Sequence, residues 1–184
     1  MPSTRRLWLT QCAGLAIFAD LAAAQQHAQQ AARSGQPFET LDPDEAREID
    51  ALASQMVPST DGPGAHEAGV VYFIDRALST FDSPLRDSYR TGLAGVQAKR
   101  TEMFPGSASI AALPANQQIE LIRAIENTEF FELLRTHTLY GLLGNPSYGG
   151  NRDHIGWKLI GFDDRHVFQA PFGYYDDPAN GGAW

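Results

Sequence analysis

Helix-start and helix-stop residues divide the middle of the sequence into short amphipathic segments, and this pattern constrains the fold most. The clearest start is Asp42, a favoured N-cap residue, followed by Pro43 at the first helical position and by two acidic residues in the first turn. Apolar residues then recur at helical spacing on one face as far as Met56, and Pro58 ends the segment. The sequence therefore predicts an amphipathic helix that begins at Pro43 and ends before Pro58.

Four further segments have the same pattern, each bounded by proline, glycine or an N-cap residue. They begin near residues 70, 84, 115 and 129, and the first of them fits helical spacing better than a strand despite its β-branched start. The predicted fold is mainly α, a small bundle of about five helices. In the last two segments the residues expected to face the core are Ile119, Ile122 and Ile125, then Phe130, Phe131, Leu134 and Thr138.

A Gly-rich stretch at residues 136–162 departs from this pattern. A helix end runs into Gly144, and the paired Gly149 and Gly150 indicate a turn with positive φ or a close approach of two backbones. The bulky apolar residues that follow predict a loop pinned to the core: Trp157, Leu159, Ile160 and Phe162. We also predict a short β-hairpin that pairs residues 157–162 with residues 166–170.

The order of residues in this stretch resembles the C-terminal signature of the gluconate 2-dehydrogenase subunit 3 family. The pattern LYGxxGNPxYGGNxxxxGWxxIGF runs from Leu139 to Phe162, and the segment EAGVVYFIDRAL, from Glu67 to Leu78, is also similar to the family. The resemblance covers about residues 43–172. It implies a non-catalytic small subunit without a cofactor of its own. Its partners would be a large GMC-type dehydrogenase subunit that holds FAD and a c-type cytochrome subunit that holds haem c.

The N-terminus resembles a twin-arginine signal peptide. Arg5 and Arg6 precede a short apolar segment, and Ala22 and Ala24 are small residues of the kind that signal peptidase selects. Three parts are therefore expected: a signal peptide at 1–24, a flexible linker at 25–40 and a single helical domain at 41–184. The resemblance further implies export through the twin-arginine translocase, with a leaderless partner carried along. The product would be periplasmic and associated with the inner membrane through the complex.

Charge and cysteine content exclude several other functions. The net charge is −8, and the 14 cationic residues form no basic stripe, so nucleic-acid binding is not expected. The single cysteine, Cys12, lies in the predicted leader. The chain that remains would have no thiolate for a disulfide, an iron–sulfur cluster, a covalent haem or nucleophilic catalysis.

Few residues suggest chemistry of the chain's own. The five histidines form neither HxxxH nor HExxH, so no metal site is expected. Asp153 and His154 are the best candidates for an acid–base pair, with Glu67 as a further carboxylate. A stand-alone periplasmic enzyme that uses these groups is one alternative function, and an adaptor for an unrelated exported protein is another.

Partner contact is the function that we predict for the signature loop. Aromatic residues and arginine dominate the energetic centres of interfaces. Asp75 and Arg76 are further interface candidates, with an internal ion pair between them as the alternative. The aromatic C-terminal tail has two open placements, on its own domain or on another subunit. The interface candidates in the loop are Tyr148, Gly149, Gly150, Asn151, Arg152 and Trp157.

Overall fold

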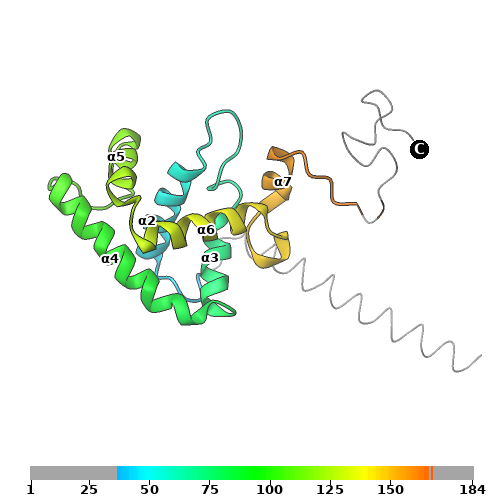
Figure 1. The fold of residues 1–184 in the computed structure, drawn as a ribbon, viewed down its shortest axis with the longest axis horizontal. Helices are drawn as coiled ribbons and strands as arrows, with labels where there is room; N and C mark the ends of the chain where they lie inside the picture. Colours follow the sequence, from blue (N-terminus) through cyan, green and yellow to red (C-terminus); the bar gives the residue numbers. More distant parts are fainter. Residues whose placement is uncertain (1–36, 166, 168–184) are drawn as a thin grey trace, which may run out of the picture.

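The computed structural model describes residues 37–165 and 167, and within them it is mainly helical with no strand (Figure 1). The predicted signal peptide, including Arg5, Arg6, Ala22 and Ala24, lies outside the described residues, as do most of the linker and of the C-terminal tail. The helices are α2 (Pro43–Met56), α3 (Val70–Ser79), α4 (Arg86–Met103), α5 (Ala115–Ile125), α6 (Glu129–Leu143) and α7 (Ile155–Leu159). Three 3-10 turns accompany them: η1 (Ser83–Leu85), η2 (Pro146–Tyr148) and η3 (Arg152–His154). The mainly α prediction is confirmed.

The helix starts follow the expected capping chemistry in α2 and α6. The Asp42 carboxylate accepts hydrogen bonds from the backbone N–H groups of Asp44 and Glu45, and the Glu45 carboxylate accepts from the Asp42 N–H, which completes a capping box. In α6, the Thr128 hydroxyl accepts from the Phe131 N–H. The third helix differs from its prediction, because Ser83 opens a 3-10 turn and the α-helix begins only at residue 86.

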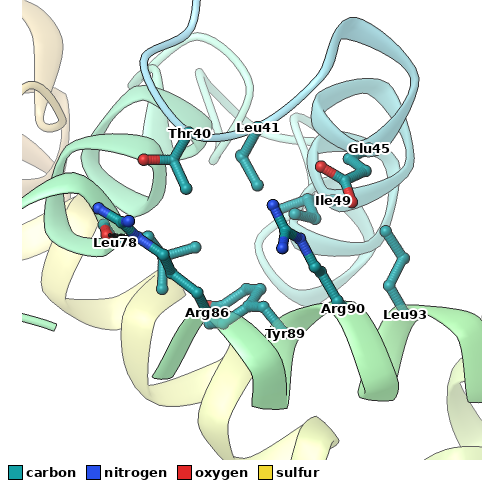
Figure 2. A pocket seen from close by; sticks show the side chains of 9 residues that line it. All are labelled: Thr40, Leu41, Glu45, Ile49, Leu78, Arg86, Tyr89, Arg90 and Leu93. Atoms are coloured by element: carbon teal, nitrogen blue, oxygen red, sulfur yellow. Dashed lines mark hydrogen bonds between the residues drawn. The ribbon is translucent and has the colours of Figure 1, made fainter. Parts of the chain in front are cut away.

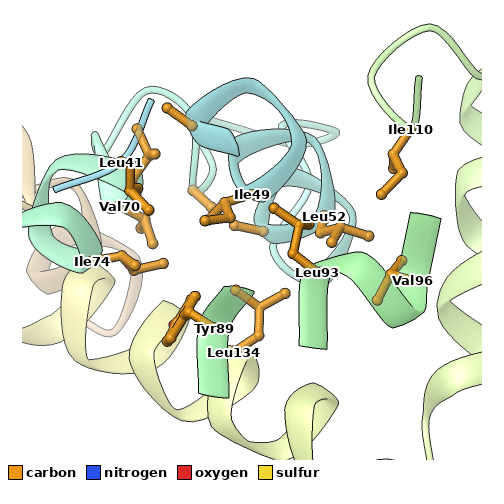
Figure 3. Close-up of a cluster of buried hydrophobic side chains, with 14 of the residues drawn as sticks. Leu41, Ile49, Leu52, Val70, Ile74, Tyr89, Leu93, Val96, Ile110 and Leu134 are labelled. Atoms are coloured by element: carbon orange, nitrogen blue, oxygen red, sulfur yellow. The ribbon is translucent and has the colours of Figure 1, made fainter. Parts of the chain in front are cut away.

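The core lies where α2, α3 and α6 meet, with α4 closing one side (Figure 3). Figure 1 shows α6 running across the middle of the body and α7 beyond its C-terminal end. The fully buried side chains include Ile49, Leu52, Ile74 and Leu134. None of the described helices has the length and apolar character needed to span a bilayer.

The predicted inward face of α5 is partly wrong. Ile125 is buried, but Ile119 is 40% exposed, and Leu121 and Gln118 face the core instead. The Gln118 amide donates hydrogen bonds to the carbonyl oxygens of Ile110 and Leu113, which ties the helix to the loop before it. Apolar spacing alone does not reveal a glutamine that faces inward for this purpose.

Asp75 holds the segment that enters α2. Its buried carboxylate accepts hydrogen bonds from the backbone N–H groups of Glu39, Thr40 and Leu41, at 2.8 to 2.9 Å. Three backbone donors thus stabilise the charge of Asp75, while the neighbouring Arg76 is exposed. Asp75 therefore anchors residues 39–41 to α3, a role that the sequence analysis did not predict.

The predicted β-hairpin is wrong. Residues 155–159 form helix α7, and Leu159, Ile160 and Phe162 are 50%, 61% and 48% exposed, so they do not pin the loop to the core. The glycine at position 156 explains the difference, because it lets this short helix pack directly on the end of α6. Apart from residue 167, the second predicted arm lies outside the described residues.

Candidate interaction surface

The signature stretch forms a compact loop over the C-terminal end of α6. The Asn145 side chain accepts a hydrogen bond from the Ser147 N–H, which sets the first turn. Gly149 then has φ +102°, and a Cβ there would lie 3.1 Å from the carbonyl oxygen of Tyr72. A Cβ on Gly150 would overlap with the carbonyl oxygen of Gly141 in α6. The paired glycines therefore serve both expected purposes, positive φ at the first and close backbone approach at the second.

Asn151 fixes this loop from the inside. It is fully buried in the left-handed region, with φ 46° and ψ 41°. Its amide nitrogen donates to the carbonyl oxygen of Gly144 at 2.8 Å, and its amide oxygen accepts from the Gly156 N–H at 2.9 Å. One side chain thus satisfies a carbonyl beyond the end of α6 and an N–H in the first turn of α7.

Helix α7 packs on the end of α6 through backbone. A Cβ on Gly156 would overlap with the carbonyl oxygen of Leu142, so the two chains touch without a side chain between them. The Trp157 indole N–H donates to the carbonyl oxygen of Leu143 at 2.6 Å. Trp157 therefore replaces the hydrogen bond that this carbonyl loses at the helix end.

The six predicted interface residues divide by exposure. Gly149, Gly150 and Asn151 are buried and build the loop. Arg152 is half-buried, with its guanidinium 5.4 Å from the centre of the Tyr72 ring and its backbone N–H bonded to the Ala68 carbonyl oxygen. Trp157 is half-buried as well. Tyr148 is 51% exposed and is the member of the set that presents a large free surface.

Tyr148 borders an apolar hollow of about 810 Å³ that has no charged side chain in its lining. The Phe81 ring, from the turn after α3, contacts the Tyr148 ring edge to face at 6.2 Å between centres. The other lining residues come mostly from α3 and the last turns of α6: Phe73, Leu139, Tyr140, Leu143 and Gly144. The hollow also has exposed large apolar residues grouped together, which is uncommon on a protein surface: Phe81, Leu139 and Tyr140.

Sequence reasoning missed Phe81, Leu139 and Tyr140 as site residues. A signal for the last two was present in the helical register. Positions 137, 138, 141 and 142 of α6 face inward, so 139 and 140 must face outward although both are apolar. Phe81 lies in a turn, where no periodicity applies.

A buried polar network lies beside this hollow. The Tyr89 hydroxyl is 2.8 Å from His137 Nδ1, and His137 Nε2 is 3.2 Å from the Asp82 carboxylate. Burial lowers the pKa of His137, and the Asp82 charge opposes this effect in part. Burial also raises the pKa of Tyr89. Both ring nitrogens of His137 thus have a polar partner, the Tyr89 hydroxyl on one side and the Asp82 carboxylate on the other.

The residues proposed for acid–base chemistry have structural partners. The Glu67 carboxylate accepts from the Ser59 hydroxyl and the Gly64 N–H, and these hydrogen bonds lower its pKa. His154 stacks near the Trp157 ring, with 4.8 Å between centres. Asp153 and His154 both have positive φ in the turn before α7. Among the described residues no three potential ligands group together to hold a metal ion.

Two other hollows have less to offer a ligand. The one in Figure 2 lies between the segment before α2, α2, α3 and α4, and its volume of about 10 Å³ holds no more than a water molecule. Arg86 beside it donates to the carbonyl oxygen of Leu78. A groove of about 570 Å³ separates α4 from the start of α6, with Asp87 and Glu129 in its lining.

Comparison with known protein families places most of the described residues in one of them. A family model described as gluconate 2-dehydrogenase subunit 3 matches residues 43–164, which includes all six helices named above and the complete signature loop. No curated protein and no solved structure matches the chain.

Proposed function

This chain belongs to the gluconate 2-dehydrogenase subunit 3 family, and from this premise we propose that it is a non-catalytic accessory subunit that binds an FAD-containing large subunit. The family relation supports membership of a dehydrogenase complex. The proposal adds the partner, a GMC-type flavoprotein, and a c-type cytochrome subunit that carries haem c. In this proposal the oxidation takes place in the flavoprotein and the present chain supplies a binding surface.

The apolar hollow at the signature loop carries the proposal. Its lining has no charged side chain, and Tyr148, Phe81 and Tyr140 give it large, rigid aromatic contacts of the kind that dominate protein interfaces. The loop beneath is held by side-chain-to-backbone hydrogen bonds from Asn151 and Trp157. A surface that is already ordered loses little conformational entropy when a partner binds.

The export role is a separate part of the proposal. We infer that Arg5 and Arg6 direct the folded chain, with its leaderless partner, through the twin-arginine translocase to the periplasm, where the complex associates with the inner membrane. The sequence of the leader is the support for this step. Binding of a partner at the hollow does not require this export step.

Affinity purification tests the partner. The tagged full-length chain is expected to bring down a yellow protein with flavin absorbance. Leu139→Ser should reduce the recovered flavin, because it places a polar group in the hollow. The matched control is Ile119→Ser on α5, since Ile119 and Leu139 are 40% and 38% exposed but Ile119 lies outside the hollow. Equal recovery with both variants would contradict the assignment of the hollow.

Two further measurements separate the alternatives. Arg5→Lys combined with Arg6→Lys should leave both proteins in the cytoplasm, and normal export of the partner would refute the carrier role. Turnover of a sugar or polyol by the purified chain alone would favour a stand-alone enzyme. Capture of a stoichiometric exported protein without flavin would favour an adaptor for an unrelated protein.

A further inference from the structure

The hollow has walls from two separate elements, and something must fix their separation. Phe81 comes from the turn between α3 and η1, whereas Leu139 and Tyr140 come from α6. Phe81 is 56% exposed, and a turn residue with so little burial is not held by the core alone. Its neighbours therefore decide where the ring lies.

The residue next to Phe81 in the chain is bound to α6. Asp82 Oδ2 lies 3.2 Å from Nε2 of His137, whose side chain is 4% exposed. His137 precedes Leu139 and Tyr140 by less than one helical turn, so this single contact joins the turn of one wall to the helix of the other.

The proton positions make the contact specific. An ionised carboxylate only accepts hydrogen bonds, so Nε2 carries the hydrogen that it donates to Asp82. In the neutral ring, Nδ1 has a free lone pair that can accept a hydrogen bond from the Tyr89 hydroxyl, 2.8 Å away. Tyr89 and His137 are buried, and this arrangement satisfies both in one tautomer.

Aromatic packing follows the same path. The Phe73 ring lies edge-on to the His137 ring at 6.2 Å and contacts the Phe81 ring at 6.3 Å between centres. Phe81 in turn contacts Tyr148 of the signature loop. A displacement of the turn at Asp82 would thus change the hollow through both hydrogen bonding and ring contacts.

We propose that Asp82 and His137 are positioning residues, which hold Phe81 against α6 and keep the apolar hollow in the shape that its partner binds. This inference rests on the proposed function, in which the hollow binds the flavoprotein subunit. It assigns neither residue to a contact with the partner.

The test compares variants of Asp82 in the full chain. Asp82→Ala and Asp82→Ser both remove the contact with His137 Nε2. Two such variants are used so that the test can still be made if one of them does not fold. Asp82→Asn keeps an oxygen that can accept from Nε2 and is the rescue variant. Glu48→Ala is the matched control, because the buried Glu48 carboxylate also bonds to a distant segment, the Ile110 N–H, but lies outside the hollow.

Two readouts are used. In the free chain, the nuclear Overhauser contact between the Phe81 and Tyr148 rings should be lost in Asp82→Ala and Asp82→Ser and kept in Asp82→Asn and Glu48→Ala. In binding to the purified flavoprotein subunit, the first two variants should be about tenfold weaker than the wild type and the other two within about twofold.

Retention of the ring contact in both Asp82→Ala and Asp82→Ser would overturn the inference. An equal loss of affinity in Glu48→Ala would also overturn it, because general destabilisation would then explain the effect. If the wild-type chain does not bind the flavoprotein at all, the proposed function fails, and the ring contacts alone still decide whether Asp82 and His137 position Phe81.

Discussion

Replacement of Asn151 should show how much of the stability of the signature loop comes from one side chain. Asn151→Gly keeps a residue that tolerates positive φ but removes the bonds to the Gly144 carbonyl and the Gly156 N–H. Each bond is worth about 1 kcal/mol net, and leaving the buried partners unpaired adds to the loss, so we expect about 2 to 4 kcal/mol in all. Asn151→Ala should lose about 1 kcal/mol more, because alanine is strained in the left-handed region.

Urea denaturation, followed by far-ultraviolet circular dichroism, gives the free energy of unfolding of the wild type and of each variant. Asn145→Ala is the control from the same loop, because Asn145 is exposed and its side chain accepts one hydrogen bond, from the Ser147 N–H, so about 0.5 to 1 kcal/mol is expected. If Asn151→Gly loses no more than this control, the buried hydrogen bonds do not stabilise the loop. If Asn151→Ala and Asn151→Gly are equal, the strain argument is wrong.

Three other results are expected. Gly156→Ala should lower the free energy of unfolding by about 2 kcal/mol or more in the same denaturation assay, because its Cβ would overlap with the Leu142 carbonyl oxygen and force the two backbones apart. Asp75→Asn should lose about 2 to 3 kcal/mol and speed hydrogen exchange of the amides of residues 39–41, since an amide group has one acceptor oxygen for three donors. Lowering the pH should act oppositely at two buried groups, measured as differences in unfolding free energy from Glu48→Gln and His137→Gln. Burial raises the pKa of Glu48 above its ordinary 4.5. The free energy of unfolding of the wild type should therefore rise relative to that of Glu48→Gln as the pH falls toward 4.5. Burial lowers the pKa of His137, which faces Tyr89 and Asp82, below 6.5. The free energy of unfolding of the wild type should therefore fall relative to that of His137→Gln as the pH falls below 6.5. The same sign for both differences would contradict the assignment of burial as the cause.

The helices were predictable because their signals are local. Asp42 with Pro43 starts α2 as the capping rules require, and apolar spacing located α3, α5 and α6. The side of α5 that faces the core was not predictable, because Gln118 turns inward to bond to two carbonyl oxygens of a preceding loop. Local periodicity does not contain that information.

The sequence predicted the signature loop but not the side chains that line the hollow beside it. The order of residues in the signature located the loop, and Tyr148 is indeed exposed there. The partner roles of all six loop residues stay predictions: Tyr148, Gly149, Gly150, Asn151, Arg152 and Trp157. Phe81 could not be found from the sequence, because it joins Tyr148 only through the packing of α3 on α6. The prediction of a hairpin was wrong because it rested on the apolar side chains alone, whereas the backbone contact that Gly156 permits places a short helix there.

The anchoring of residues 39–41 by Asp75 has a consequence for the order of events during synthesis. The anchored amides leave the ribosome about 35 residues before the carboxylate that binds them, since the partners are 34 to 36 positions apart. Until α3 has emerged, the backbone N–H groups of residues 39–41 lack the carboxylate that accepts their hydrogen bonds. Closure of that loop therefore marks the moment at which the segment before α2 becomes attached to α3.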